Sequence, residues 1–357
     1  MRHALGLAAL GLHTTDPNPR VGCVLVRDGR VVGEGWHERA GGPHAEARAL
    51  QSAGLAAHGA TAYVSLEPCA AQGRTPPCTA ALAAAGVSRV VYAVDDPDPR
   101  MRAGAARLRA AGIEVAGGLL ENEARELNPG FFSRHERGRP WLRLKLGASL
   151  DGRTALASGA SRWITGEQAR ADAQLYRARS SVVLTGSGTV LADDPALNVR
   201  LEGAGRQPLR AVLDGRLRVP PSARIYDPEG PSMVFTYSDD AAQTAALQRA
   251  GVTVERLAAA PGGGVDLASV CSRLAGLEAN EVWAEAGPRL AGALLGARLV
   301  DELLVYIAPC LLGPDARPLA QMPPLRDLDA RLQLQFQSAQ FVGPDLRIIA
   351  RPAPPGG

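Results

Sequence analysis

Four side chains in the first quarter of the sequence are of the types that bind and use a catalytic metal ion. His44 and Glu46 are separated by one residue at the expected start of a helix. Cys69 follows an expected strand, and Cys78 lies at the start of the next expected helix. One imidazole and two thiolates are zinc ligands, and three protein ligands leave the fourth position to a water whose pKa the metal lowers. The pattern predicts a catalytic zinc site with His44, Cys69 and Cys78 as ligands.

Glu46 has the position expected of a proton carrier. An activated water can attack an amidine-like ring carbon, but an amine leaves poorly until it is protonated, so a carboxyl group near the metal has a clear task. His-x-Glu followed by Pro-Cys is typical of zinc nucleobase deaminases. Taken singly, these residues could be a helix-terminal histidine, a carboxylate favoured by the helix dipole and two buried thiols. Together they favour a deaminase.

A second group of chemically capable residues lies in the other half of the chain. Lys145 is the only lysine among 39 basic residues and lies on the expected strand 141–146, where it could act on a sugar or simply be a surface lysine. Another expected strand ends at Glu285, Gly287 permits close approach, and a helix begins near Pro288. The free N–H groups of such a helix start can hold a phosphate, although many helix starts bind nothing.

Composition limits the classes of protein to consider. A chain of 357 residues usually forms two domains, and 46% hydrophobic with 21% charged residues is ordinary for a soluble protein. The net charge of +3 comes without basic blocks, which argues against nucleic acid as a partner. No stretch approaches the roughly 18 apolar residues of a membrane span, so we expect a cytoplasmic protein. Five dispersed cysteines argue against a disulfide framework.

Expected strands and helices alternate in both halves, which predicts two α/β domains, residues 1–138 and 139–357. The polar segment 134–140 is the expected boundary, and the chain is expected to end in short strands. The expected elements of the first half lie at residues 4–11, 21–26, 30–36, 46–53, 61–65, 79–85, 89–93, 104–111, 113–115 and 121–128. Those of the second half include 141–146, 182–185, 210–213 and 281–285.

Six short motifs in the first half match one family of zinc deaminases. They are Thr15-Asp16-Pro17-Asn18-Pro19, Val21-Gly22-Cys23-Val24, Gly35-Trp36-His37, His44-Ala45-Glu46, Glu67-Pro68-Cys69 and Gly73-Arg74-Thr75-Pro76-Pro77-Cys78. On these residues the first half resembles the deaminase of the bacterial riboflavin pathway, with a cytidine-deaminase-like α/β/α sandwich. The resemblance implies that Asn18 contacts the pyrimidine and that residues 73–75 help to hold the substrate. Ala70-Ala71-Gln72 departs from the family, which usually has a histidine there.

Four further motifs match the partner activity of the same bifunctional family. They are Lys145-Leu146-Gly147-Ala148-Ser149-Leu150-Asp151-Gly152-Arg153, Trp163-Ile164-Thr165, Thr189-Val190-Leu191-Ala192-Asp193-Asp194-Pro195 and Glu285-Ala286-Gly287-Pro288-Arg289-Leu290-Ala291-Gly292. On these residues the second half is similar to the NADPH-dependent reductase, which has a dihydrofolate-reductase-like fold. The resemblance implies one zinc ion, NADPH and a homo-oligomer. It also implies deamination of 2,5-diamino-6-(5-phosphoribosylamino)pyrimidin-4(3H)-one and then reduction of its ribosyl chain to ribityl.

The resemblance also assigns roles residue by residue. Lys145 would be catalytic, and Asp151 would close a turn or orient the sugar. The implied cofactor-binding residues are Gly147, Trp163, Thr189, Asp193, Gly287, Pro288, Arg289, Leu290, Ala291, Gly292 and Ala293. The implied substrate-binding residues, besides Asn18, are Ser161, Arg177, Leu197, Arg200 and Glu285. The ordinary alternatives are a core position for Trp163, a helix cap for Asp193 and a solvated surface for the arginines.

Two other interpretations of the whole chain stay open. One is a tRNA or nucleotide deaminase joined to an unrelated folate-type reductase, and the other is a zinc-stabilised binding module without activity. Acidic residues such as Asp95, Asp96 and Asp98 lie among the arginines of the first half, which argues against a nucleic-acid substrate. Glu46 argues against a purely structural metal, because such a site has no use for a proton carrier.

Overall fold

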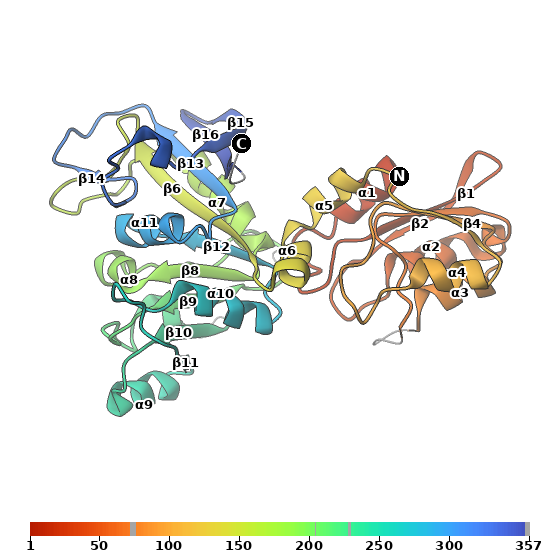
Figure 1. Ribbon diagram of the computed structural model, residues 1–357, viewed down its shortest axis with the longest axis horizontal. Helices are drawn as coiled ribbons and strands as arrows, with labels where there is room; N and C mark the ends of the chain where they lie inside the picture. Colours follow the sequence, from red (N-terminus) through yellow and green to blue (C-terminus); the bar gives the residue numbers. More distant parts are fainter. Residues whose placement is uncertain (72–75, 204, 228–229, 354–357) are drawn as a thin grey trace. The chain divides into compact units, whose positions relative to one another are not determined.

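The computed structural model describes residues 1–71, 76–203, 205–227 and 230–353. The chain divides into two compact units, Met1–Gly138 and Arg139–Gly357, and each is built on its own sheet (Figure 1). No helix in the described ranges combines the length and the apolar character needed to cross a membrane.

The first unit is a five-stranded sheet with helices on both faces. The strand order is β2-β1-β3-β4-β5, in which β1 is antiparallel to β2 and β3 and the remaining pairs are parallel. The strands are β1 (Gly22–Arg27), β2 (Arg30–Trp36), β3 (Thr61–Val64), β4 (Arg89–Tyr92) and β5 (Glu114–Ala116). The helices are α1 (Arg2–Ala9), α2 (Ala45–Ala53), α3 (Cys78–Ala84), α4 (Gly104–Ala110), α5 (Glu121–Leu127) and α6 (Pro129–Arg137).

Glycines on β1 and β2 allow the helices to pack directly against the sheet. A Cβ atom on Gly35 would lie 2.6 Å from the backbone nitrogen of Ala49 in α2, closer than any side chain allows. On the opposite face, a Cβ on Gly22 would lie 2.0 Å from the carbonyl oxygen of Ala4 in α1. The close approach of α2 fixes its first turn, and this is the turn that carries Glu46.

The two units divide at Gly138, within the segment 134–140 in which the sequence places the domain boundary. Part of this segment is helical, because α6 continues to Arg137 and ends at Gly138, whose φ of +67° is the left-handed conformation common after helices. Phe131 and Phe132 are buried at its start, and the polar residues that suggest a linker belong to the same helix. The sequence did not predict this helix, because its apolar face is confined to the first turns.

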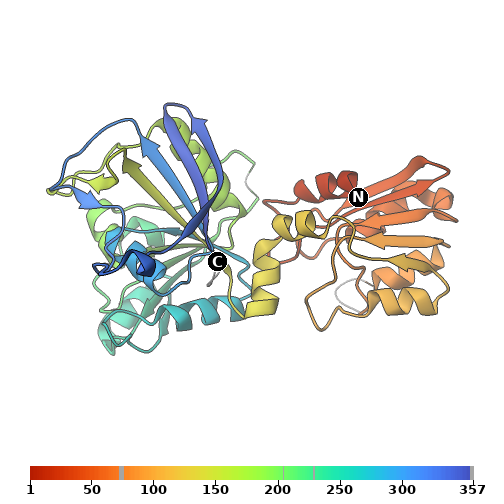
Figure 2. The same ribbon diagram turned by 45° about the horizontal axis from the view of Figure 1, so that its top comes forward.

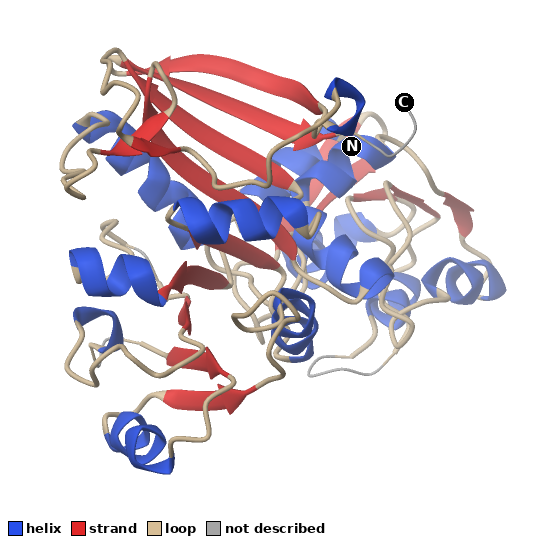
Figure 3. Cartoon of the chain, turned by 60° about the vertical axis from the view of Figure 1, so that its left-hand side comes forward, coloured by secondary structure: helices blue, strands red, loops and turns tan. Residues whose placement is uncertain are grey.

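The second unit contains a nine-stranded sheet of order β11-β10-β9-β8-β12-β6-β13-β16-β15, with helices packed on it (Figure 3). All neighbours from β11 to β13 are parallel, and β16 and β15 are antiparallel additions. Its strands are β6 (Trp141–Ser149), β8 (Val182–Gly186), β9 (Leu209–Leu213), β10 (Ser232–Thr236), β11 (Thr253–Arg256), β12 (Glu281–Glu285), β13 (Glu302–Ala308), β15 (Leu334–Val342) and β16 (Asp345–Pro352). A small separate sheet pairs β7 (Arg153–Ala155) with β14 (Arg317–Pro318).

Alternation along the central strands gives this sheet a core on each face. Val183 of β8 and Trp283 of β12 belong to one cluster, whereas Leu184 and Ala284 belong to the other. Residues of α10 and α11 join the Leu184 cluster, and residues of α7, α8 and α9 join the Val183 cluster. These helices are α7 (Glu167–Arg179), α8 (Ser187–Asp193), α9 (Ala241–Arg249), α10 (Leu267–Gly276) and α11 (Pro288–Gly296).

The last two strands are longer than expected. β15 and β16 have nine and eight residues and form a hairpin at one edge of the sheet, drawn in blue in Figure 2. A break in register between Phe336 and Ser338 interrupts the alternation of β15, and most of its residues are exposed. The expectation of short strands was wrong because such an irregular, exposed strand has little hydrophobic pattern to detect.

The register of the parallel strands brings distant residues to one edge of the second sheet. Glu285, the last residue of β12, pairs with Lys145 of β6. β8 ends at Gly186 beside them, and β9 ends at Leu213. Open α/β sheets bind their ligands at the carboxyl ends of their strands, so this edge is the place to look for a site.

Candidate functional sites

His44, Cys69 and Cys78 meet at one point in the first unit. His44 immediately precedes α2, Cys69 lies in the loop after β3, and Cys78 is the first residue of α3. Nδ1 of His44 is 3.2 Å from Sγ of Cys78 and 3.7 Å from Sγ of Cys69. All three ligand atoms lie within 4.8 Å of one another. The three predicted ligands are therefore brought together from parts of the chain 34 residues apart.

The spacing of these atoms fits a tetrahedral zinc ion. Bonds of about 2.0 Å to nitrogen and about 2.3 Å to sulfur place tetrahedral N and S ligands about 3.5 Å apart. The two nitrogen–sulfur distances, 3.2 and 3.7 Å, lie on either side of this value. The side-chain hydrogen bond with Cys78 also lowers the pKa of Cys69, to about 4. The thiolate is the form that binds metal, so this hydrogen bond favours metal binding by Cys69.

Two residues to which the sequence assigned no role, Glu67 and Gly104, hold the loop that carries Cys69 in place. The buried carboxylate of Glu67 accepts hydrogen bonds from the backbone N–H groups of Asp96 at 3.2 Å and Ala105 at 2.8 Å. A Cβ on Gly104 would lie only 1.9 Å from the carbonyl oxygen of Pro68. The loop before Cys69 therefore lies directly on the start of α4. In the sequence, Glu67 stands out only as part of a motif shared with the family. Its hydrogen-bond partners, Asp96 and Ala105, are too distant along the chain to be inferred from the sequence.

Glu46 lies in the first turn of α2, next to the metal ligands. Its side chain is 3% exposed, and burial raises the pKa of this carboxyl while the charge of His44 opposes the shift. A raised pKa brings a carboxyl group nearer to the pH at which it can both accept and donate a proton. The structure thus gives Glu46 the surroundings of a proton carrier.

Asn18 is held in a fixed orientation by a histidine to which the sequence alone assigned no role. Nδ1 of His37 donates to the carbonyl oxygen of Pro43 at 3.0 Å, and burial lowers the pKa of His37. The neutral ring therefore accepts at Nε2, 3.0 Å from Nδ2 of Asn18. This leaves Oδ1 of Asn18 as an acceptor. The centroid of the His37 ring is 5.6 Å from that of His44, so Asn18 lies close to the metal ligands.

The loop between the two cysteines is only partly described. Residues 73–75, expected to help hold the substrate, lie outside the described residues. Ala70, where the sequence departs from the family, is buried, and its N–H donates to the carbonyl oxygen of Met101 at 3.1 Å.

A cavity of about 1900 Å³ lies at the carboxyl ends of the strands in the second unit. Two of the expected cofactor residues do not line it: Ala291 is buried in the core, and Gly292 faces inward, where a Cβ would lie 2.0 Å from the carbonyl oxygen of Gln321. The other expected cofactor-binding and substrate-binding residues of this half, and Lys145, all line it, namely Lys145, Gly147, Ser161, Trp163, Arg177, Thr189, Asp193, Leu197, Arg200, Glu285, Gly287, Pro288, Arg289, Leu290 and Ala293.

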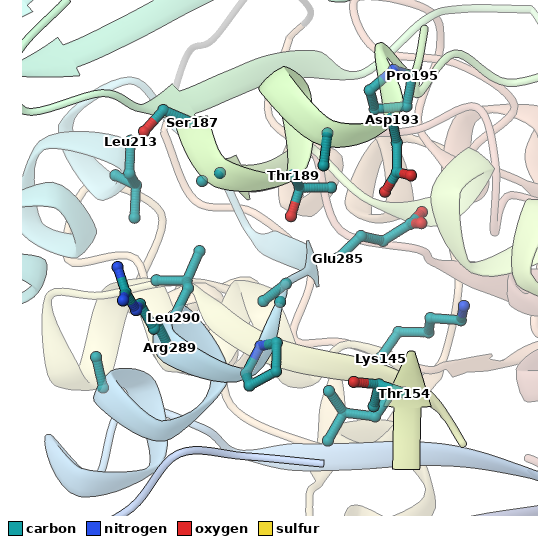
Figure 4. Close-up of a pocket in the computed structure, with 18 of the residues that line it drawn as sticks. Lys145, Thr154, Ser187, Thr189, Asp193, Pro195, Leu213, Glu285, Arg289 and Leu290 are labelled. Carbon is teal, nitrogen blue, oxygen red and sulfur yellow. The ribbon is translucent and has the colours of Figure 1, made fainter. Parts of the chain in front are cut away.

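Lys145 and Glu285 extend into this cavity from neighbouring strands (Figure 4). Oε1 of Glu285 accepts from Nε of Arg177 at 2.5 Å and from Nε1 of Trp283 at 2.9 Å. Burial alone would raise the pKa of Glu285, but Arg177 and Lys145 lower it to about 2. Burial lowers the pKa of Lys145, against the pull of Glu285. Within the described part of the chain, Nζ of Lys145 has no hydrogen-bond partner, so it is available to a ligand.

The two arginines expected to bind phosphate have different surroundings. Besides its ion pair with Glu285, Arg177 donates to the carbonyl oxygen of Asn198 at 3.0 Å. Arg200 is exposed in the cavity, and its guanidinium has only a long contact of 3.4 Å with Oδ1 of Asn198. Gln174, which the sequence did not single out, fixes the backbone of Arg200 by accepting from its N–H at 3.0 Å. Arg200 is therefore better placed for a phosphate than Arg177.

The ordinary alternatives for two other residues do not hold. Trp163 is 69% exposed, with the guanidinium of Arg170 4.4 Å from its ring centroid, so it is not a core residue. Asp193 is the last residue of α8, not an N-cap. Asp151 does not line the cavity: its carboxylate accepts from the backbone N–H groups of Leu312 and Gly313, at 3.1 and 2.9 Å, and so holds a segment that is distant in the sequence.

Both parts of the chain match known protein families. Residues 1–94 match the cytidine and deoxycytidylate deaminase zinc-binding region, and residues 140–348 match the RibD C-terminal domain. The riboflavin biosynthesis protein RibD of Escherichia coli (strain K12) is 50% identical over 359 residues, which cover 97% of this chain and 96% of that protein. The match therefore includes both units.

Solved structures agree with this relationship over the whole chain. Acinetobacter baumannii RibD, form 1, aligns with a TM-score of 0.92 and 42% identity, covering 99% of this chain and 98% of that one. A diaminohydroxyphosphoribosylaminopyrimidine deaminase/5-amino-6-(5-phosphoribosylamino)uracil reductase of Thermotoga maritima aligns with a TM-score of 0.87 and 32% identity, covering 99% and 97%. The expected fold is confirmed, a cytidine-deaminase-like domain followed by a dihydrofolate-reductase-like one. The chain belongs to the RibD family of bifunctional deaminases and reductases of riboflavin biosynthesis.

Proposed function

We propose that the first unit deaminates 2,5-diamino-6-(5-phosphoribosylamino)pyrimidin-4(3H)-one and that the second unit then uses NADPH to reduce the ribosyl chain of the product to ribityl. The observation that carries this proposal is the presence of both sites in one chain: the triad of His44, Cys69 and Cys78 in one unit, and the cavity with Lys145 and Glu285 in the other. The name of the Thermotoga maritima relative gives the same pair of substrates for that protein.

In the deaminase site, the residues of the chain bind the ring and move one proton. Zinc held by the triad supplies Lewis-acid activation of water when it is bound. The Glu46 carboxylate accepts the proton from the attacking water and passes it to the departing amino nitrogen, which then leaves as ammonia. Oδ1 of Asn18, oriented by His37, accepts a hydrogen bond from an N–H group of the pyrimidine.

In the reductase site, Lys145 and the arginines act on the sugar. NADPH supplies the hydride that is added to C1 of the ribose. The Lys145 ammonium donates a proton to the ring oxygen as the bond from that oxygen to C1 breaks, which balances the hydride added to C1. Glu285 holds Arg177 at the side of the site, and Arg200 binds the sugar phosphate, since guanidinium matches phosphate geometry.

The experiment that tests this proposal separates the two reactions. Purified protein is assayed for zinc and then given the diaminopyrimidinone substrate without NADPH, and amine release is measured. We expect one zinc ion per chain and amine release without any coenzyme. Zinc binding without amine release would contradict the deaminase proposal and indicate a structural metal or a different ring as substrate.

We also propose that the protein forms a homo-oligomer through the second unit. β15 is an edge strand, and its Phe336 and Phe341 side chains are 75% and 81% exposed. Exposed aromatic residues on an unpaired edge are a surface that proteins usually cover. A second copy of the chain can cover it.

A further inference from the structure

The turn between β15 and β16 packs against the start of α7. This turn consists of Gly343 and Pro344, and Asp345 follows it as the first residue of β16. Oδ2 of Asp345 accepts a hydrogen bond at 2.6 Å from the backbone N–H of Gly166, the residue that precedes α7. A Cβ on Gly343 would lie 2.8 Å from Cδ of Gln168, so the turn lies directly on the first turn of the helix.

Asp345 is a charged residue in an almost completely buried position. It is 1% exposed, and burying a carboxylate is costly unless its charge is stabilised. Among the residues that the structure describes, its side chain has one hydrogen-bond donor, the N–H of Gly166, and no ion pair. The start of a helix carries a partial positive charge, which also stabilises a carboxylate. The acidic group at this helix start thus comes from a distant part of the chain.

The segment before α7 connects this contact to the reductase cavity. Trp163 and Thr165 line the cavity, and so does Arg170 of α7. Nη1 of Arg170 donates to the carbonyl oxygen of Thr165 at 2.7 Å, and its guanidinium is 4.4 Å from the centroid of the Trp163 ring. The segment 163–165 is therefore tied to the first turns of α7, and through Gly166 it is tied to Asp345.

Thr165 brings this segment next to the proposed proton donor. A Cβ on Gly147 would lie 3.4 Å from Cγ2 of Thr165 and 3.5 Å from Nζ of Lys145, so both side chains approach the same point beside Gly147. The group proposed to bind the sugar phosphate is held separately, because Gln174, further along α7, fixes the backbone of Arg200. A shift of the segment would therefore act first on the groups around the reacting carbon.

We propose that Asp345 is a positioning residue of the reductase, which holds Gly166 and thereby fixes Thr165 and its neighbours beside Lys145. The inference rests on the proposed reductase function. Asp345 does not line the cavity, so its effect must pass through the backbone of residues 163–166. What it controls is the alignment of the reacting groups, and misplacing such groups by about 1 Å can cost about 100-fold in rate.

The test compares Asp345→Ala with Asp345→Asn. Asparagine keeps an oxygen that can accept from the N–H of Gly166, whereas alanine leaves that N–H without its acceptor. Steady-state kcat and KM are measured for NADPH oxidation on the deaminated substrate, and folded sites are counted by calorimetric titration with NADPH. We expect kcat per site to fall about 10-fold to 100-fold in Asp345→Ala and to keep its wild-type value in Asp345→Asn. The KM of the substrate and amine release by the first unit are expected to stay at wild-type values in both variants.

Asp240→Ala is the matched control. Asp240 caps α9 by accepting from the backbone N–H of Gln243 at 3.0 Å, and neither Asp240 nor any residue of α9 lines the cavity. The control thus loses a carboxylate at a helix start of the same unit, and we expect it to lose stability but to keep its kcat per site. Equal losses of kcat per site in Asp240→Ala and Asp345→Ala would overturn the proposal, because both would then reflect a general loss of stability.

The other outcomes separate this inference from the function on which it rests. Wild-type kcat per site in Asp345→Ala, or an equal loss in Asp345→Asn, overturns the positioning role and leaves the reductase proposal intact. Failure of the wild-type chain to oxidise NADPH with the deaminated substrate overturns the reductase proposal itself.

A second variant decides the question if Asp345→Ala binds no NADPH. Gly343→Ala keeps the carboxylate but moves the turn away from α7, because Gly343 has a left-handed φ of +62° and its new Cβ would meet Gln168. We expect a lower kcat per site in this variant, and an unchanged value overturns the proposal.

Discussion

At the scale of single residues, each site combines one group that can move a proton with neighbours that set its charge. Glu46 is buried beside the metal ligands, and burial raises its pKa. Lys145 faces a cavity, and burial lowers its pKa while Glu285 opposes the change. Both shifts bring a group toward the pH range in which enzymes operate, which is the usual arrangement for acid and base catalysts.

Glu46→Gln tests the proton carrier. The amide has nearly the same shape but cannot accept a proton from water and pass it on, so we expect amine release to fall about 10²-fold to 10⁴-fold. Zinc content, measured by mass spectrometry, is expected to stay at the wild-type level because His44, Cys69 and Cys78 are unchanged. A variant that retains wild-type amine release would show that another group carries the proton.

The pH dependence of reduction tests Lys145. The ammonium form is the proton donor, so kcat/KM for NADPH oxidation on the deaminated substrate is expected to fall as pH rises through the pKa of Lys145. Burial places that midpoint below 10.5, the ordinary value for lysine. Glu285 raises the pKa of Lys145, so in Glu285→Gln the midpoint is expected to move to a lower pH. A midpoint that moves upward, or a profile unchanged in Lys145→Met, would contradict the assignment.

At the scale of elements, the sites depend on close contacts between loops and helix starts. The zinc ligands come from the start of α2, the loop after β3 and the start of α3. Glu67 and Gly104 hold the β3 loop on the start of α4. In the second unit, the pairing of β12 with β6 places Glu285 beside Lys145. A substitution that disturbs one of these contacts should therefore change the activity of the site in its own unit and leave the activity of the other unit unchanged.

Gly104→Ala tests this coupling. The new Cβ would meet the carbonyl oxygen of Pro68, so the loop that carries Cys69 must shift, at a cost of about 1–3 kcal/mol in the free energy of unfolding. We expect less than one zinc ion per chain and slow amine release, with NADPH oxidation on the deaminated substrate unaffected. Gly6→Ala is the control, because a Cβ there meets nothing within 4 Å. Full zinc content in Gly104→Ala would contradict the claim that the contact between Gly104 and Pro68 positions Cys69.

At the scale of the whole molecule, two units with separate cores carry separate chemistry. The first ends with α6, and the second begins with β6, whose Lys145 lies in the reductase cavity. The exposed β15 edge is the surface that we propose for association. A bifunctional chain of this kind links two consecutive reactions by covalent connection.

Phe336→Ser/Phe341→Ser tests the proposed association. Replacing two exposed aromatic side chains on the β15 edge removes apolar surface that a second copy would bury. We expect the mass in solution, measured by light scattering, to fall from that of an oligomer to that of one chain, whereas the buried Phe235 and Trp283 of the second unit remain to stabilise its fold. If the wild-type chain is itself monomeric, the proposed oligomer is wrong.

The sequence predicted the metal site better than its surroundings. The ligand types of His44, Cys69 and Cys78 are chemically distinctive, so their spacing and context were enough. The supporting role of Glu67 depends on hydrogen bonds to residues 29 and 38 positions away, which no local pattern reveals.

Helix orientation explains why two of the expected cofactor residues in the reductase half do not line the cavity. Ala291 and Gly292 belong to a shared motif, but the rotation of α11 turns them toward the core and toward Gln321. A motif gives residue identity, whereas the face of a helix depends on what packs against it. The sequence also failed to predict α6. The buried Phe131 and Phe132 lie near the start of this helix, and the polar residues that follow them suggest a loop.

The most direct test of the central claim, two sites acting in a fixed order, uses Glu46→Gln with each of two substrates. NADPH oxidation is followed first with the diaminopyrimidinone and then with the same compound after deamination. The account predicts no oxidation with the first and wild-type oxidation with the second, because the reductase site is intact and acts on the deaminated product. Oxidation of NADPH at equal rates with both compounds would contradict the proposed order, and oxidation with neither would contradict the independence of the two sites.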